Sequence, residues 1–462
     1  MQSSKRKNKL EINILSAIVG IITILITIGA ILIALSTREL FFKISVTGYV
    51  LLLFVVLYIY IYYYNKDILK YKNRSLLYMC IYVISMIAVV SMCRLPYLVI
   101  PIPIAGMLVA IMFDNRLGIV TNISLTIIGL LVSGYGLSLF LFYIISGTFA
   151  CIIISQAKKR NNIVFISAYL VILNVILVLL INLYQFGNLS RLNIMDILYA
   201  GINSTFSVII TIGSLPLWET LFDVATPLKL LELTNSDQKL IQRLLLEAPG
   251  TYHHSQMVSN LAQTAANDIG ANALLAKTGA IYHDIGKLKN PIYFTENQND
   301  TNPHDELDPV SSAKIIINHV TYGVKLATEN HLPKAVRNII KQHQGDTIVK
   351  YFYNKAIETS DGFEVDENDF RYDGPKPQTN EAAIIMLADC VEAYVRALPE
   401  ANRTLDNIEK CIREIINNKF NEGQLNECNL KIKELPIIGN SFMKVYNGLY
   451  HERVKYPDNE VE

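Results

Sequence analysis

The sequence has 462 residues, which allows more than one domain, and a formal net charge of only +1. A charge balance this close to neutral gives no support to a DNA or RNA polymer as a partner. The hydrophobic share of 52% is divided unevenly: residues 11–222 are mostly long apolar runs, whereas charged residues are spread throughout the chain from about residue 230 onward. The six cysteines include no C-x-x-C pair, which argues against a thiolate zinc site and a disulfide framework.

Long apolar runs fill the first half of the chain. A helix needs about 20 apolar residues to cross a bilayer, and such runs must be helical there because no water satisfies the backbone. We predict a cytosolic tail at 1–11 and a transmembrane domain at 12–222 with about eight helices, and not a very large buried helical core. The predicted spans are 12–35, 46–64, 75–93, 97–113, 117–134, 137–155, 162–184 and 197–217. Pro96, Pro101 and Pro103 lie in or beside one span and are interpreted as a tolerated kink in preference to a ligand site.

Lysine and arginine are distributed unequally between the connections of these spans. The N-terminal tail and the connections 65–74, 114–116 and 156–161 carry twelve of them, and the opposite connections carry four. Because positively charged short loops stay in the cytosol, the N-terminus is predicted to be cytosolic, and eight spans return the chain to the cytosol. We therefore expect a multi-pass protein with the lipid bilayer as a partner.

The second half of the chain is predicted to be soluble and helix-rich. Residues 223–247 have helix-like periodicity and are interpreted as a helical linker to a domain at 248–456. Thr379 or Asn380 can cap a helix that runs to about Leu398. Strand signals are few, so the predicted fold is all-α: a polytopic transmembrane helical bundle followed by an all-helical cytosolic domain.

The histidines are concentrated in this second half, where seven of the eight lie between residues 253 and 343. The adjacent pair His283-Asp284 offers an imidazole and a carboxylate, and a carboxylate can bridge two metal ions. Lys287 follows three residues later, on nearly the same helix face, where its ammonium can neutralise a phosphate oxygen. Gly286 is expected to let a substrate approach this helix closely.

Further polar residues in apolar or helical surroundings extend this set: His254, His319, His343 and Asp389. His254 precedes His283 by 29 residues, so an antiparallel helix pair could bring the two together. Asp389 lies in an apolar stretch, where an unpaired carboxylate is costly to bury. Each residue alone could be an ordinary core residue, but together they supply enough ligands for two metal ions. A second His-Asp pair, His304-Asp305, is interpreted as structural.

The order of these residues resembles the HD superfamily of metal-dependent phosphohydrolases, and more narrowly the PgpH-type membrane phosphodiesterases of bacteria. The narrower resemblance rests on GTYHHS at 250–255, HDIGK at 283–287, ENQ at 296–298, NPHD at 302–305, DFRY at 369–372 and GPKPQT at 374–379. It covers residues 225–456 closely, and the seven spans from residue 46 onward in architecture. The domain at 248–456 is therefore identified as an HD phosphodiesterase domain.

The resemblance implies an enzyme of the bacterial cell membrane that hydrolyses cyclic di-AMP to the linear dinucleotide pApA with two divalent ions, Mn or Fe. It implies that one ion is held by His254, His283, Asp284 and Asp389, and the second by Asp284, His319 and His343. The implied catalytic residues are Asp284 and Lys287. Asp284 would bridge the ions, and Lys287 would contact the scissile phosphate. His253 and His304 do not correspond to ligands.

Two features depart from the family pattern. Gln344 stands where the family usually has a second histidine after His343, so either the shell of the second ion or a substrate contact is changed. Only about ten residues, 36–45, join the first two spans, where the family usually carries a large extracytoplasmic domain. The chain therefore resembles a shortened form.

Two alternatives stay open at this stage. One keeps the HD chemistry but acts on cyclic di-GMP or a nucleotide, although the Gly-Tyr-Pro motif of the cyclic di-GMP branch is absent. The other is a catalytically weak or inactive membrane receptor that binds a cyclic dinucleotide, and Gln344 motivates it. The sequence also allows a homodimer.

Overall fold

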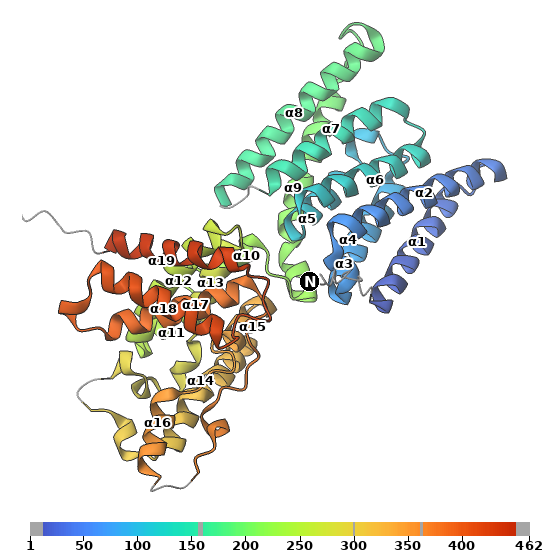
Figure 1. Cartoon of the computed structure of the whole chain (residues 1–462). Coiled ribbons are helices and arrows are strands. Elements are labelled where there is room, and N and C mark those ends of the chain that lie inside the picture. The colour runs from blue at the N-terminus through green and yellow to red at the C-terminus, as the bar shows by residue number, and fades with distance from the viewer. Residues whose placement is uncertain (1–12, 156–159, 299–300, 361–363, 450–462) are drawn as a thin grey trace, which may run out of the picture. The chain divides into compact units, whose positions relative to one another are not determined.

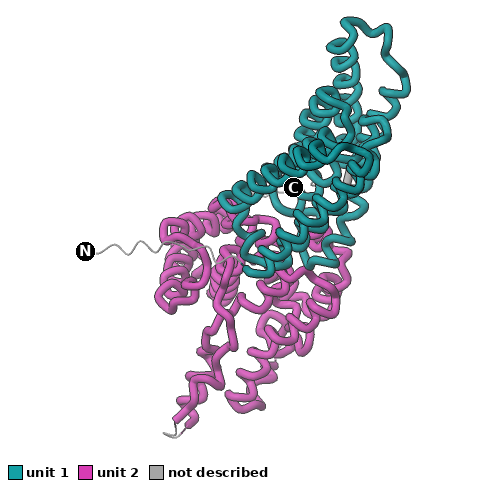
Figure 2. The backbone as a smooth tube through the Cα atoms, turned by 90° about the vertical axis from the view of Figure 1, so that its right-hand side faces the viewer, with its two compact units in different colours: residues 1–228 teal, residues 229–462 magenta. Residues whose placement is uncertain are grey.

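A computed structural model describes residues 13–155, 160–298, 301–360 and 364–449, which are almost entirely helical (Figure 1). Within these residues there is no strand, and one isolated β-bridge joins Ile348 to Arg371. The chain divides into two compact units, Met1–Leu228 and Lys229–Glu462 (Figure 2). The prediction of an all-α fold is confirmed.

The first unit is a bundle of long apolar helices. Its elements are α1 (Ile14–Ala34), α2 (Leu40–Tyr64), α3 (Lys66–Lys70), α4 (Lys72–Met92), the 3₁₀ turn η1 (Tyr97–Val99), α5 (Pro103–Met112), α6 (Asn115–Ser133), α7 (Gly136–Ile154), α8 (Arg160–Phe186) and α9 (Ile194–Phe222). Among the described residues, seven helices are long and apolar enough to cross a membrane: α1, α2, α4, α6, α7, α8 and α9.

The span predicted at 97–113 takes a different form. Only Pro103–Met112 is α-helical, and ten residues extend about 15 Å, roughly half the thickness of a hydrocarbon core. Pro101 and Pro103 explain the interruption, because a proline has no backbone N–H to donate and its ring clashes with a preceding helical turn. The prolines therefore break this span and do not merely kink it.

The broken segment nevertheless carries the chain back across the bundle. Tyr78 and Tyr82 of α4 contact Thr121 and Ser124 of α6 in the same order, at 3.1 and 2.6 Å between oxygens, so α4 and α6 run parallel. Two long helices in succession can be parallel only if the segment between them returns to the starting end. The broken segment therefore returns the chain to the end of the bundle at which α4 begins.

Side chains from neighbouring helices satisfy the backbone of the broken segment. The Asn203 amide donates to the carbonyls of Leu98 and Ile100, at 2.7 and 2.9 Å, and the Tyr143 hydroxyl donates to the carbonyl of Tyr97 at 2.6 Å. Unmet backbone groups cost several kcal/mol in hydrocarbon, so non-helical backbone is tolerated there only inside protein. These contacts supply that protection.

The second unit contains the histidine-rich region and begins within α10 (Pro227–Leu233). Its longer helices are α11 (Lys239–Glu247), α12 (Pro249–Asp268), α13 (Ala273–Tyr282), α14 (Pro309–Glu329), α15 (Lys334–Gln342), α16 (Lys350–Thr359), α17 (Asn380–Ala397), α18 (Leu405–Asn421) and α19 (Leu435–Leu449). Its 3₁₀ turns are η2 (Ile285–Lys289), η3 (Pro291–Tyr293), η4 (Thr295–Asn297), η5 (Pro303–Glu306), η6 (Glu367–Phe370), η7 (Glu400–Asn402) and η8 (Ile432–Glu434).

Helix α17 forms the centre of this unit's core. Its apolar face, with Ile384, Ile385 and Leu387, is fully buried in one cluster with residues of α12, α13, α18 and α19. As predicted, Thr379 caps the helix: its hydroxyl accepts a hydrogen bond from the Ala382 N–H at 3.2 Å. A helix held this rigidly gives the polar residues on its face defined positions.

Candidate metal centre

The His283-Asp284 pair lies just beyond the end of α13, where the chain enters η2. The pair was predicted on an α-helix with Lys287 on nearly the same face, whereas the structure places Asp284 to Lys287 in a tighter 3₁₀ turn. In a 3₁₀ helix residues i and i+3 eclipse each other. The Lys287 Nζ lies 2.7 Å from Asp284 Oδ2.

Gly286 lies directly against the backbone of α14, and close approach of a substrate to it remains a prediction. A Cβ atom at this position would lie 1.8 Å from the carbonyl oxygen of His319 and 2.6 Å from the nitrogen of Gly323, both in the backbone of α14. Glycine is required here because η2 packs directly on that helix. Its effect on the centre is to let α14 bring His319 up to Asp284.

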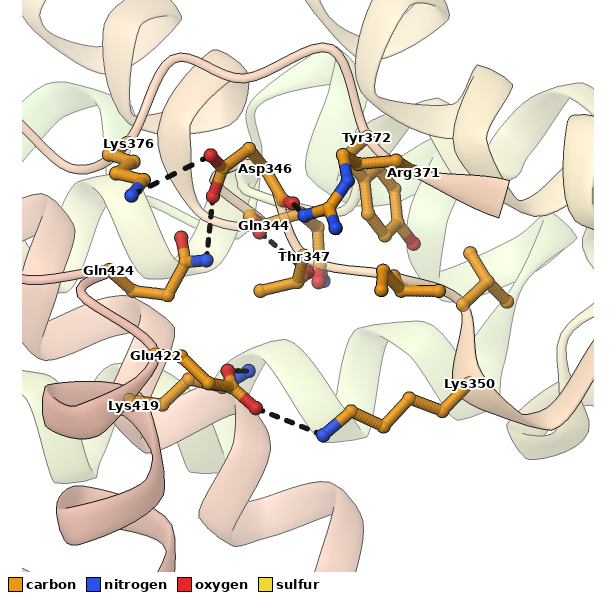
Figure 3. A pocket seen from close by; sticks show the side chains of 12 residues that line it. Gln344, Asp346, Thr347, Lys350, Arg371, Tyr372, Lys376, Lys419, Glu422 and Gln424 are labelled. Atoms are coloured by element: carbon orange, nitrogen blue, oxygen red, sulfur yellow. Dashed lines mark hydrogen bonds and ion pairs between the residues drawn. The ribbon is translucent and has the colours of Figure 1, made fainter. Parts of the chain in front are cut away.

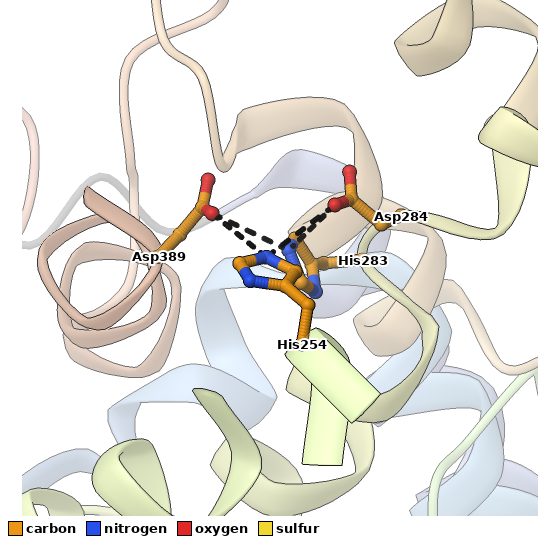
Figure 4. Close-up of side chains that lie close together, drawn as sticks. All are labelled: His254, His283, Asp284 and Asp389. Atoms are coloured by element: carbon orange, nitrogen blue, oxygen red, sulfur yellow. Dashed lines mark ion pairs between the residues drawn. The ribbon is translucent and has the colours of Figure 1, made fainter. Parts of the chain in front are cut away.

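Four predicted residues from three parts of the unit meet in a first group: His254 of α12, His283, Asp284 and Asp389 of α17 (Figure 4). The Nε2 atom of His254 lies 3.0 Å from Asp389 Oδ1 and 3.5 Å from Asp284 Oδ2. The Nε2 atom of His283 lies 3.3 Å from the same Asp284 oxygen. The antiparallel pairing of α12 and α13 brings the two imidazoles together, with ring centroids 5.3 Å apart.

A second group shares Asp284 with the first. The Nε2 atoms of His319 and His343 lie 3.3 and 3.6 Å from Asp284 Oδ1, and 3.1 Å from each other. Asp284 therefore turns Oδ2 toward the first group and Oδ1 toward the second. All six residues predicted as metal ligands thus lie in these two adjoining groups.

The imidazole rings are held so that Nε2 points inward. The Nδ1 atoms of His283, His319 and His343 lie 2.7, 2.6 and 2.8 Å from the backbone carbonyl three residues earlier. Because a carbonyl oxygen only accepts, each Nδ1 carries a hydrogen, and Nε2 is the nitrogen left to bind a metal. His254 differs, because its Nδ1 contacts the carboxylate of Glu392, one turn after Asp389 on α17. Such outer contacts fix the orientation of metal-binding histidines.

The donors of this centre fit a divalent metal ion. The His283 Nε2 atom and Asp284 Oδ1 are buried without a hydrogen-bond partner among the described residues, an arrangement that is costly unless a cation completes it. Burial would raise the pKa of Asp284, but His283 and Lys287 outweigh it and hold that pKa well below its usual range. Imidazole nitrogens and carboxylate oxygens suit Zn, Mn or Fe ions. The centre thus has the chemistry of a divalent metal site.

Lys287 is held between two carboxylates at the edge of the centre. Its Nζ lies 2.6 Å from Glu296 Oε1 as well as 2.7 Å from Asp284, and it sits 5.0 Å from the centroid of the Phe294 ring. Burial alone would lower the pKa of Lys287, but the two carboxylates outweigh it and raise that pKa. Glu296 has its own pKa lowered to about 2, because Lys287 outweighs the opposing effect of burial. The ammonium is therefore charged at neutral pH.

Sequence reasoning did not identify two of the acidic residues around the centre. Glu296 lies in the ENQ segment, and Glu392 lies three residues after Asp389, so both had a local signal. Arg396 links them, with nitrogen–oxygen distances of 3.7 Å to Glu296 and 4.0 Å to Glu392. Together they form an outer layer of charge behind His254 and Lys287.

The remaining polar residues of interest lie beside these groups or outside them. The Gln344 amide donates to Asp389 Oδ2 at 3.0 Å, so this residue touches a predicted ligand. His304 contacts the carbonyl of Tyr293 through Nε2 at 2.9 Å and packs on Phe352, in keeping with a structural role. His253 belongs to neither ligand group.

Both halves of the chain match known protein families. Residues 40–226 match the family described as a 7TM receptor with intracellular HD hydrolase, and residues 251–394 match the HD domain. The cyclic-di-AMP phosphodiesterase PgpH of Bacillus subtilis is 38% identical over 441 residues, which make up 92% of this chain and 61% of that protein. PgpH of Listeria monocytogenes is 39% identical over 366 residues, with shares of 78% and 50%. The chain thus spans roughly half to three fifths of the length of these relatives.

Among solved structures, the HD domain of L. monocytogenes PgpH in complex with cyclic-di-AMP is similar to this chain. The sequence identity is 48%, the match covers 47% of this chain and 100% of that one, and the TM-score is 0.45.

Proposed function

The chain belongs to the family of seven-transmembrane proteins with an intracellular HD hydrolase domain, which includes the PgpH proteins, and we propose that it hydrolyses cyclic di-AMP to pApA. One observation carries the proposal: Asp284 presents one carboxylate oxygen to each of two adjoining ligand groups. That arrangement suits two divalent ions acting on a phosphodiester. The names of the two PgpH relatives support the choice of cyclic di-AMP.

The ligand groups define which residues would hold the ions, Mn or Fe. His254, His283, Asp284 and Asp389 would hold one, and Asp284, His319 and His343 the other. When bound, such an ion pair supplies an activated water and stabilises negative charge on the phosphoryl group. The chain's contribution is to keep Asp284 ionised and to aim the imidazole nitrogens at one point, which the backbone carbonyls and Glu392 achieve.

Lys287 and Gln344 are the residues proposed to contact the substrate. The Lys287 ammonium, which Glu296 helps to keep charged, can bind a non-bridging oxygen of the scissile phosphate by exchanging part of its pairing with Asp284. Gln344 lies against Asp389 and can donate its amide hydrogens to a substrate oxygen. An amide does not transfer protons, so the leaving ribose oxygen must receive its proton from another donor, such as water.

The membrane unit supports a location of this chemistry at the cytosolic face of the bacterial membrane. Seven apolar helices make the chain a multi-pass membrane protein. Twelve lysines and arginines lie in the tail and connections at one side and four at the other, and the richer side faces the cytosol by the charge rule. The return of the broken segment supports this topology, because the chain then leaves the bundle on the same side as its N-terminus.

The test is hydrolysis of cyclic di-AMP by the full chain in lipid nanodiscs with Mn²⁺ or Fe²⁺. We expect pApA from the wild type, loss of turnover in Asp284→Ala, and faster turnover in Gln344→His if the histidine restores a proton donor. Absence of product from a folded, metal-loaded wild type would contradict the proposal. Parallel assays with cyclic di-GMP test the other substrate.

A catalytically weak receptor is the second candidate, and the contact of Gln344 with Asp389 favours it. In that function the chain would bind cyclic di-AMP without cleaving it, because one imidazole of the usual pair is missing. Tight binding without turnover in the wild type, together with turnover in Gln344→His, would select this candidate over the enzyme.

A further inference from the structure

A cavity of about 570 Å³ lies beside the metal centre (Figure 3). Gln344 and Tyr372 line it, and both also touch the centre: Gln344 donates to Asp389, and the Tyr372 ring centroid lies 6.0 Å from that of His319. Its volume is within the range of small-molecule sites, about 300–1,000 Å³. The cavity and the metal centre therefore share a wall.

The wall opposite Gln344 is positively charged. Lys350 and Lys419 both pair with Glu422, at 2.9 and 3.0 Å, so two ammonium groups share one carboxylate and leave a formal charge of +1. Lys376 adds a third ammonium, 3.6 Å from Asp346. This part of the cavity therefore has an excess of cations, which suits an anion.

Lys419 is the best-placed of these cations. Its side chain is 16% exposed, whereas that of Lys350 is 72% exposed. A partly buried ammonium that Glu422 already orders loses little freedom when it binds an anion. Lys419 can therefore contribute more to binding than a free surface lysine.

A cyclic dinucleotide carries two phosphodiesters on opposite sides of one ring. When the scissile phosphate lies at the metal centre, the second one must lie on the far side of the ring, in a neighbouring cavity. We infer that the cavity beside Gln344 binds this second, non-scissile phosphate, and that Lys419 is its principal contact. The inference rests on the proposed function and adds a subsite to it.

The first experiment measures KM for cyclic di-AMP with the full chain in nanodiscs. Lys419→Met keeps an unbranched side chain but removes the charge, and we expect KM to rise about tenfold or more. Lys410→Met is the matched control, because Lys410 is exposed on the same helix, α18, and does not line the cavity. Unchanged metal content and unfolding temperature in both variants show that the fold is intact.

The second experiment pairs the variant with a cyclic di-AMP analogue in which one linkage is a neutral methylphosphonate, so that only the charged linkage is cleaved. The wild type should lose about as much affinity for this analogue as Lys419→Met loses for cyclic di-AMP. The two changes should not add, because each removes one partner of the same contact. Additive effects, or no effect of Lys419→Met, would overturn the inference.

The two proposals fail in distinguishable ways. If the wild type cleaves cyclic di-AMP but Lys419→Met behaves like Lys410→Met, the subsite is wrong and the enzyme assignment stands. If the wild type does not cleave it, the proposed function is wrong, and calorimetric Kd values for the same proteins and ligands test the subsite. A Kd that rises in Lys419→Met alone would support the subsite, and equal Kd values would overturn it.

Discussion

Glu392 is expected to strengthen metal binding through His254. Its side chain is 10% exposed, and its carboxylate contacts His254 Nδ1, where the other three ligand histidines contact neutral carbonyls. A carboxylate in this position makes the imidazole a better donor, and removing such a partner costs about 10–100-fold in metal affinity. Glu392→Gln keeps an acceptor for the Nδ1 hydrogen and removes only the charge. We therefore expect a loss of metal affinity at the lower end of this range, about tenfold or 1.4 kcal/mol.

Glu392→Leu removes the acceptor as well and frees the ring to rotate. We expect a loss near the upper end of the range, about a hundredfold or 2.7 kcal/mol. The structure also contains a competing effect, since any loss of negative charge near the centre weakens its attraction for a cation. Arg396, 4.0 Å from Glu392, partly offsets that charge already. The difference in metal affinity between the Gln and Leu variants therefore measures how much the fixed orientation of the His254 ring contributes.

Glu409→Gln is the matched control, because it makes the same change of charge on α18 at a side chain that is 44% exposed and pairs with Arg413. The assay is calorimetric titration of the metal-free full chain in nanodiscs with Mn²⁺, with thermal unfolding of each metal-free variant as a check on the fold. If Glu392→Gln and Glu409→Gln change the Mn²⁺ Kd equally, the contact with His254 has no role and the reasoning is refuted.

Three further predictions concern pH, packing and the membrane unit. Although burial opposes it, Asp284 raises the pKa of His283 to about 10 in the metal-free chain, so a proton must leave when a metal ion binds. The affinity for the metal ion should therefore rise with pH. Calorimetry at about pH 8 in two buffers of different ionisation enthalpy should show this proton release. A finding of no release would contradict this protonation state. Gly286→Ala would force a Cβ against the backbone of α14 and should lower the free energy of unfolding by about 1–3 kcal/mol or more. Gly448→Ala is the control and should leave it unchanged, because nothing lies within 4 Å of a Cβ at that position. Equal unfolding temperatures of the two variants would disprove the close approach. Asn203→Leu leaves the Leu98 carbonyl without its side-chain donor, while Ile100 keeps the Tyr143 hydroxyl, and should lower the free energy of unfolding by about 1–3 kcal/mol. An unchanged denaturation midpoint in detergent would show that other donors replace it.

Local sequence patterns predicted much of this protein. Runs of about 20 apolar residues correspond to seven observed helices, because the cost of bare backbone in a bilayer is a local property of each run. Thr379 was recognisable as a cap, since a hydroxyl at that position can meet the free N–H groups of the helix start. His254, His283, Asp284, His319, His343 and Asp389 were chosen by residue type and order, and the structure places their side chains together.

Other features depended on contacts between distant segments. The sequence indicated proline near residue 100 but not that Asn203 and Tyr143 would stabilise a broken span. It indicated glycine at 286 but not that α14 would pack against it. Glu392 and Lys419 gain their roles from the side chains that tertiary folding brings to them, His254 in one case and Glu422 in the other. Sequence determines which groups a segment can offer, whereas the distances between those groups, and thus their chemistry, arise only when separate helices pack into one core.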